Sequence, residues 1–219
     1  MKRVFAVFLA FSSCACSMDS DTGRIGSLAL DLVRGSSTRV TREQAAAVPY
    51  ASMGMAVGSG PQGLLVLGML TPDQAEWYAG EHIFVATAPN GQILRTIGLP
   101  YDLGGLRLDM TPADQNTQGE ASSLARRITF DFPDLGIYNA GAQCTARDLG
   151  DESVDILGAS LSTRHVVQHC EVPVLKWRFD NDFWRDPDTG LVWRTSQHIH
   201  PKSPAVTLEV LRPVQQAMQ

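Results

Sequence analysis

The stretch from residue 181 to residue 201, NDFWRDPDTGLVWRTSQHIHP, gathers the side chains most suited to chemistry in this chain. It holds two tryptophans, three aspartates and a His-x-His pair. Carboxylates beside aromatic rings suit a cleft that binds or cleaves sugar, and acids beside histidines suit a metal site. The same residues also suit a plain β-hairpin, so their spacing has to decide.

The spacing of the acids argues against a calcium site. Asp180, Asp182, Asp186 and Asp188 are interrupted by Phe and Trp residues, and no acid lies five residues after Gly190. A calcium loop alternates its acids, follows them with glycine and closes with a later glutamate. We therefore expect no calcium here.

Two histidine pairs have the spacing of metal ligands on a strand. His198 and His200 would point to the same side of an extended chain, and so would His165 and His169. A zinc site needs three or four ligands, and further ligands would have to come from distant parts of the chain. We predict ordinary strand histidines, no metal and no cofactor.

Hydrolase chemistry needs a nucleophile with its base, or two carboxylates that flank a cleft. The sequence contains no Gly-x-Ser-x-Gly elbow. Nothing in the spacing of the acids selects a pair such as Glu76 with Asp102. We therefore expect that the chain is not an enzyme.

The segment Asp186-Pro187-Asp188-Thr189-Gly190 has the composition of a turn. Proline presets its own φ, an aspartate accepts backbone N–H groups, and glycine adopts a positive φ without strain. The runs FWR and LVWRT flank it, so Trp184 and Trp193 are expected in paired strands, on one face or diagonally across the pair.

The elements that position these residues are predicted to be mostly strands. After Pro49 the chain consists of short apolar or alternating runs, and the Asn-Gly pair at 90–91 is typical of a tight hairpin. We predict a mainly antiparallel β domain, barrel-like or sandwich, with one or two short N-terminal helices. Helical spacing over 24–35 and the N-cap residue Thr41 indicate those helices, and the polar segment 101–123 is a predicted loop.

Composition describes one ordinary folded domain. The chain has 219 residues, 44% of them hydrophobic, and a net charge of −5. The sequence has no run of basic residues interleaved with aromatics, which is the pattern of a surface that binds a phosphate backbone. Nucleic acid is therefore not an expected partner.

The N-terminus has the pattern of an export signal. Lys2 and Arg3 precede the apolar run 4–11, which is too short to span a bilayer, and small residues with cysteines follow. A cysteine after a small residue resembles a lipoprotein acylation site. Cys16 follows Ala and is preferred, and Cys14 follows Ser and is the alternative. A soluble secreted protein is the other interpretation.

These signals divide the chain into three parts. We predict a cleaved lipoprotein signal peptide over 1–15, a tether over 16–24 and a single mainly-β domain over 25–219. Acylation would anchor the domain to a membrane. Neither cysteine has an adjacent Asp, the residue that retains lipoproteins in the inner membrane of enteric bacteria, so the periplasmic side of the outer membrane is the expected location.

Export also affects the two remaining cysteines. An oxidising periplasm allows Cys144 and Cys170 to pair, and closing that loop would stabilise the fold by roughly 3 to 4 kcal/mol. Two buried, reduced cysteines are the alternative.

Several stretches together resemble the YjbF/GfcB family of lipoproteins, from about Pro49 to Pro213. They are PYASMGMAVG, GLLVLGML, AEWYAG, RTIGLPYDLGG, FDFPDLGIY, NDFWRDPDTGLVWRTSQHIHP and LEVLRP. The resemblance implies a mainly β, barrel-like fold and an outer-membrane accessory of exopolysaccharide or group 4 capsule secretion. It implies no catalytic residues.

From this resemblance and the residues we expect the domain to bind glycan or a partner of the export machinery. The alternatives are a structural adaptor that docks on an outer-membrane β-barrel protein and, less favoured, a polysaccharide hydrolase. The aromatics expected to stack on sugar are Trp77, Tyr78, Trp177, Trp184 and Trp193. The competing interpretation places these rings in the β core.

Overall fold

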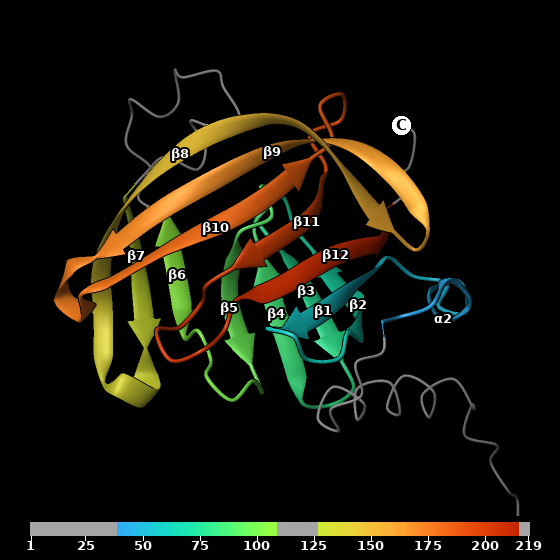
Figure 1. Ribbon diagram of the computed structural model, residues 1–219. Helices are drawn as coiled ribbons and strands as arrows, with labels where there is room; N and C mark the ends of the chain where they lie inside the picture. Colours follow the sequence, from blue (N-terminus) through green and yellow to red (C-terminus); the bar gives the residue numbers. More distant parts are fainter. Residues whose placement is uncertain (1–38, 109–126, 215–219) are drawn as a thin grey trace, which may run out of the picture.

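The computed structural model describes residues 39–108 and 127–214. They form one twelve-stranded antiparallel sheet and a short helix (Figure 1). The predicted signal peptide, tether and helix over 24–35 lie outside the described residues. In the described ranges, no helix is long and apolar enough to cross a membrane.

The helix and strands follow one another along the chain. Their bounds are α2 (Arg42–Ala46), β1 (Ser52–Val57), β2 (Gly63–Leu70), β3 (Ala75–Ala79), β4 (Ile83–Thr87), β5 (Ile93–Ile97), β6 (Gly105–Leu108), β7 (Arg127–Phe132), β8 (Ile137–Ile156), β9 (Ala159–Val172), β10 (Trp177–Arg185), β11 (Val192–Gln197) and β12 (Val206–Arg212). Two 3-10 helices, η2 (Pro133–Leu135) and η3 (Pro173–Leu175), join β7 to β8 and β9 to β10.

The sheet is nearly closed into a barrel. Its strand order is β5-β4-β3-β2-β1-β12-β11-β10-β9-β8-β7-β6, so its two edge strands, β5 and β6, are consecutive in the chain. The Thr96 amide donates to the Leu103 carbonyl at 3.0 Å, which brings the edges together. The prediction of an antiparallel barrel-like domain is confirmed, and the sandwich alternative is not.

Asp102 shapes the connection between the two edge strands. Its carboxylate accepts hydrogen bonds from the Thr96 hydroxyl at 2.9 Å and from the Gly98 and Leu99 amides at 3.0 and 3.1 Å. Gly98 has φ +91°, and a β-carbon there would lie 2.0 Å from the His82 carbonyl oxygen. This tight connection continues into β6, which the sequence analysis placed inside a loop. A strand of four residues is too short to show a clear alternation.

Side chains alternate between the inside and the outside of the barrel, as the two-residue period of strands requires. Most inward apolar side chains form one continuous core, and Val166, Phe183 and Val192 form a smaller one. The members of the larger core include Met53, Met55, Leu65, Trp77, Val85, Ile93, Leu106, Ile128, Phe130, Phe132, Cys144, Cys170, Val172, Phe179, Ile199, Val206 and Leu208.

The long hairpin of β8 and β9 reaches across the outside of the barrel toward α2 (Figure 1). At its tip, the Arg42 guanidinium donates to the Leu157 carbonyl, and Leu157 packs against the small core that contains Val48. The Arg194 guanidinium donates to the Asp155 carbonyl at 2.7 Å. The hairpin therefore braces the N-terminal helix against the sheet.

The helix itself begins where the sequence predicts. Thr41 is its N-cap, and a capping box joins Thr41 to Gln44 in both directions: the Gln44 amide donates to the Thr41 hydroxyl, and the Thr41 amide donates to the Gln44 side chain. Such a box satisfies two of the amides that a helix start leaves without partners.

Candidate functional site

The five aromatics proposed to contact glycan lie in four different surroundings. Trp77 is buried, and its indole N–H donates to the Thr87 hydroxyl at 3.0 Å. Trp177 belongs to a cluster of rings in the core, 4.0 Å from Phe179 between ring centroids. Tyr78 points outward on β3 and is 40% exposed. The structure therefore does not gather the five into one aromatic platform.

The two tryptophans of the opening hairpin fall on opposite faces of it. Trp184 lies on the outside of the barrel, stacked on His165 with ring centroids 4.6 Å apart, and the Arg194 guanidinium lies over its ring. Trp193 lines a cavity at one end of the barrel together with Trp77. The hairpin pairs Trp184 with Arg194 and Arg185 with Val192, and a bulge lies between these two pairs.

The turn of that hairpin follows the prediction for Asp186 to Gly190. The Asp186 carboxylate accepts the Asp188 and Thr189 amides, each at 2.9 Å, and Gly190 has φ +74°. The Trp193 indole N–H adds a longer contact to the same carboxylate at 3.4 Å. These donors, the Thr189 amide foremost, lower the pKa of Asp186.

The cavity lies at the end of the barrel formed by the β4–β5 turn and the β10–β11 turn. It measures about 180 Å³, and β1, β3, β11 and β12 contribute inward side chains to its wall. Met53, Trp77, Trp193 and Leu208 are among those side chains. We call this the open end of the barrel.

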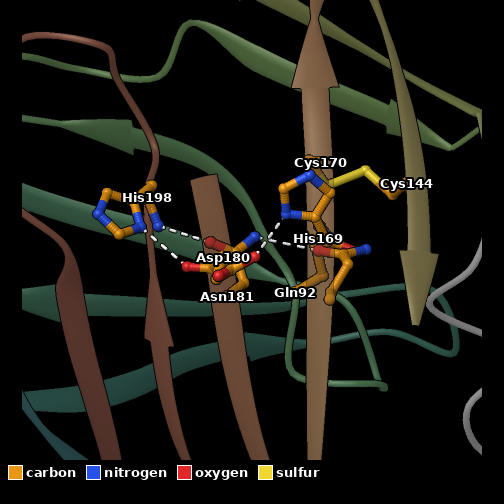
Figure 2. Close-up of a disulfide and its surroundings, with 8 residues drawn as sticks. Gln92, Cys144, His169, Cys170, Asp180, Asn181 and His198 are labelled. Atoms are coloured by element: carbon orange, nitrogen blue, oxygen red, sulfur yellow. Dashed lines mark hydrogen bonds and ion pairs between the residues drawn. A yellow bond between two sulfur atoms is a disulfide. The ribbon is translucent and has the colours of Figure 1, made fainter. Parts of the chain in front are cut away.

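A layer of amide side chains crosses the barrel beneath the cavity. Gln168, Asn181 and Gln197 stand side by side on β9, β10 and β11, and Gln92 reaches them from the opposite wall. Asn181 donates to Gln168 at 3.0 Å and accepts the His198 amide at 2.7 Å (Figure 2). Gln197 accepts the Ile93 amide at 3.0 Å, so the layer also ties the walls together.

Beyond the amide layer the barrel is filled with rings. Phe130, Phe132, Trp177 and Phe179 contact one another with centroids 4.0 to 6.2 Å apart. His200 is fully buried at this end, where its ring meets Phe132 edge-on. We call this the filled end.

The ring nitrogens of His200 have fixed roles at the filled end. Its Nδ1 accepts the Lys202 amide at 3.1 Å, so its Nε2 carries the proton toward Asp134, also at 3.1 Å. Its ring also stacks on Tyr101. His200 therefore serves the packing of the core, whereas the neighbouring His198 makes its contact with the Asp180 carbonyl at 3.0 Å.

The cysteines Cys144 and Cys170 form a disulfide in the structure (Figure 2). They are directly opposite each other on β8 and β9, and both side chains point into the core. The bond therefore links two strands that are already paired in register. It lies next to the amide layer, because Gln168 and Cys170 are successive inward residues of β9.

Histidines and acids alternate on the outer face of β9 and β10. His169 meets Asp180 at 2.7 Å, and His165 lies 2.8 Å from both Glu152 and Asp182. Within residues 39–108 and 127–214, no group of three or more His, Cys, Asp or Glu side chains is placed to hold a metal ion. The geometry is that of surface pairs.

Tyr78 forms the most exposed part of the aromatic set. Its ring lies over Gly68 of the neighbouring strand, since a β-carbon there would come within 2.5 Å of the ring. Its hydroxyl donates to Glu76 at 2.9 Å, and Gln74 donates to the other oxygen of that carboxylate at 2.9 Å. The hydrogen bond to Glu76 raises the pKa of Tyr78.

Sequence reasoning missed the cavity and the amide layer. Both depend on which side chains face inward at the same height, and the register of twelve strands sets that height. One signal was present: Gln168, Asn181 and Gln197 occupy positions within strand-like runs where the apolar alternation would place a core residue.

Comparison with known proteins identifies relatives over nearly the whole chain. The family model for the group 4 capsule polysaccharide lipoprotein GfcB, YjbF, matches residues 25–211. The uncharacterized lipoprotein GfcB of Escherichia coli K12 is 25% identical over 215 residues, which cover 96% of each chain. The crystal structure of the hypothetical lipoprotein YmcC from the same organism aligns with TM-score 0.61 at 22% identity, over 77% of this chain and 89% of that one.

The fold defines the class of the protein: a nearly closed, single-sheet antiparallel barrel of the kind that YmcC shows. The chain belongs to the YjbF family of lipoproteins. The resemblance stated from its sequence motifs is thereby confirmed, and membership implies membrane anchoring and a place in the cell envelope.

Proposed function

We propose that this protein is a lipid-anchored accessory of capsule or exopolysaccharide production that acts by binding, on the periplasmic side of the outer membrane. The observation that carries the proposal is the match of residues 25–211 to a family described by its association with group 4 capsule polysaccharide. The binding target is the glycan itself or a protein of the export machinery.

The outer face around Tyr78 is the best surface for a glycan. One side of the ring rests on the Gly68 backbone, and the exposed remainder offers an apolar face to a sugar ring. Glu76 and Gln74 lie beside it and present oxygen and nitrogen atoms to sugar hydroxyls. Of the five aromatics, Trp77 and Trp177 serve the core, so Tyr78 is the one with the freest surface.

The test compares Tyr78→Ala with Tyr138→Ala in a strain whose own copy of the gene is deleted. Tyr138 is a matched control because it is also exposed, at 60%, and lies on β8. We expect deletion to reduce polysaccharide at the cell surface, and Tyr138→Ala but not Tyr78→Ala to restore it. Normal polysaccharide after deletion would contradict the proposal.

A binding measurement separates the two targets. The purified protein is titrated with the polysaccharide of its own host while bound sugar is measured by equilibrium dialysis. Retained sugar that Tyr78→Ala abolishes supports the glycan. If no sugar is retained at millimolar saccharide, the glycan target is rejected, and crosslinking in the envelope should instead recover an export protein.

The anchor has its own test. Cys16→Ser should abolish metabolic labelling with a fatty acid and release the protein from outer-membrane fractions, whereas Cys14→Ser should change neither. Labelling that survives Cys16→Ser and disappears with Cys14→Ser would assign the anchor to Cys14. Both positions lie outside the described residues, so this part rests on sequence.

A further inference from the structure

The cavity at the open end has a wall that differs in chemistry from a sugar site. Among the described residues that line it, none is charged, and most contribute aliphatic or indole surface. The hydroxyls in the wall are Thr87 and Thr195, and each already has a protein partner. The Thr87 hydroxyl accepts the Trp77 indole N–H at 3.0 Å, and the Thr195 hydroxyl accepts a hydrogen bond from the Gln197 side chain at 2.9 Å.

A sugar ring that moved from water into this cavity would lose more hydrogen-bonding free energy than it gained from burial. Every hydroxyl that leaves water needs a new hydrogen-bond partner, and a wall with two engaged hydroxyls offers few. An apolar chain has no such requirement, because it gains from leaving water in proportion to the area it buries. The wall therefore favours a hydrocarbon over a glycan.

The amide layer lies behind the cavity wall. The Gln197 side chain donates to the carbonyl of Gly91 at 2.7 Å, and Gly91 lines the cavity. A volume of about 180 Å³ corresponds to roughly six water-sized groups at about 30 Å³ each. The space is therefore suited to the end of a chain of about six carbons.

The rim continues the apolar wall to the surface. Leu70 lines the cavity and is nevertheless 56% exposed. Pro89 and Leu191 contribute from the two turns. Exposed apolar side chains that lead into an apolar cavity form a path along which a longer chain can lie partly outside.

We propose that the open end of the barrel binds one aliphatic chain of a membrane lipid or fatty acid, with its terminal carbons inside and its polar end in water. Family membership places this protein at a membrane, where such chains are abundant. The proposal is independent of the glycan surface, because Tyr78 points outward from β3 while Trp77, its neighbour in the chain, points inward.

The test uses the polypeptide from residue 17 to residue 219, which lacks the acylated cysteine and retains every described strand. A dansyl-labelled undecanoic acid reports binding by fluorescence, and saturated fatty acids of increasing length compete with it below their micelle concentrations. Affinity should rise about fourfold for each added methylene and level off once about six carbons are buried. Failure of every fatty acid to displace the probe would overturn the proposal, and so would competition that does not depend on chain length.

Two variants locate the site. Ala75→Phe adds a ring to the cavity wall at the start of β3, and it should weaken binding at least tenfold. Tyr138→Ala, at a surface position outside the cavity, should leave binding unchanged. A mass spectrum that shows an intact disulfide and an unchanged melting temperature establishes that Ala75→Phe has folded. If folded Ala75→Phe binds as tightly as the wild type, the cavity is not the site.

The outcome of the polysaccharide-binding test can be distinguished from the outcome of the fatty-acid test. Loss of host-polysaccharide binding in Tyr78→Ala concerns the outer face, and loss of fatty-acid binding in Ala75→Phe concerns the interior. Displacement of the dansyl probe by the host polysaccharide, with no displacement by fatty acids, would overturn the aliphatic chain and assign the cavity to sugar.

Discussion

The two ends of the barrel interior follow the same alternation of strands and differ in what fills them. At the filled end, the rings of Phe130, Phe132 and Phe179 interlock with Trp177. At the open end, the wall surrounds a cavity of about 180 Å³. The amide layer of Gln92, Gln168, Asn181 and Gln197 lies between them, and the apolar core continues past it through side chains of β1, β3 and β12.

With the cavity as the proposed ligand site, the barrel divides stability from binding between its two ends. Tightly packed rings supply dispersion and burial at one end, so the other end can keep space without unfolding the protein. Changes at the filled end should therefore act on stability, and changes at the open end on ligand affinity.

The largest effect is expected at the filled end. Phe132 is fully buried among rings, and Phe132→Ala should lower the free energy of unfolding by about 3 to 5 kcal/mol, because the variant loses burial and leaves a void. Trp193→Ala, beside the existing cavity, should cost only about 1 kcal/mol. Urea denaturation of both variants measures the contrast, and equal losses would show that the two ends are not mechanically distinct.

The disulfide comes next. Cys144 and Cys170 are separated by 26 positions, and in the chain-entropy model their bond stabilises the fold by roughly 3 to 4 kcal/mol. The double variant Cys144→Ala with Cys170→Ala should unfold at a lower denaturant concentration than the oxidised wild type. Under a strong reductant the two proteins should become nearly equal, and a difference that persists there would point to packing instead of the covalent bond.

The amide layer should give an intermediate effect. Asn181→Leu removes the acceptor of the part-buried His198 amide and the hydrogen bond from Asn181 to the Gln168 side chain, and it should cost about 1 to 3 kcal/mol. Asp180→Ala is the matched control, because Asp180 is the preceding residue and its carboxylate meets His169 at the surface. The free energy of unfolding should fall by less than about 1 kcal/mol in Asp180→Ala. An Asn181→Leu variant as stable as the wild type would refute a structural role for the layer.

The two 3-10 corners beside the filled end offer a smaller and matched pair. Each consists of a Pro-x-Leu segment and is followed by a residue with left-handed backbone angles, Gly136 at φ +64° and Lys176 at φ +49°. Nothing lies within 4 Å of a β-carbon added at Gly136, so Gly136→Ala tests backbone strain alone and should cost about 1 kcal/mol. Lys176→Gly should stabilise by about 0.5 kcal/mol, since glycine relieves the same strain but loses more entropy on folding. Melting temperatures that move in the same direction for both variants would contradict this account.

The smallest expected effect is on the stability of the fold at acidic pH. The Arg107 guanidinium, at 2.6 Å, and then the Asn139 amide hold the pKa of Asp131 below its ordinary value. A carboxyl whose pKa is lower in the folded state stabilises the fold above its unfolded pKa near 4, and this contribution is lost as the pH falls through the folded value. Asp131→Asn should therefore lower the melting temperature at pH 7 and reduce the further drop between about pH 4 and pH 2. A wild-type and a variant curve that stay parallel through that range would contradict the assignment.

The sequence predicted the elements that depend on local chemistry. The capping box at Thr41, the turn from Asp186 to Gly190 and the β4–β5 hairpin each rely on the conformations of a few consecutive residues. The β4–β5 hairpin nevertheless differs in detail from the prediction. A tight Asn-Gly turn would give both residues a positive φ. Here Gly91 has a positive φ, at +83°, and Asn90 does not, because the connection includes Ala88, whose amide donates to the Gln92 carbonyl.

The candidate site was less accessible to sequence reasoning. Trp77 and Tyr78 are adjacent and equally aromatic, yet one is buried in the barrel and the other is exposed. Composition marks both as sugar-binding candidates, and only the side of the strand on which each lies separates them. The surroundings of the half-buried Trp177 and Trp193 likewise depend on strands that are distant in the chain.

By itself, the sequence determined the family, the strand-rich architecture and the local turns and cap of this protein. These features depend on residue types at fixed short spacings, which act before distant segments meet. Only the tertiary structure decided that the interior is divided into a filled and an open end. That division depends on which side chains from nonadjacent strands lie at the same height in the barrel, and register and closure set it only when the chain has folded.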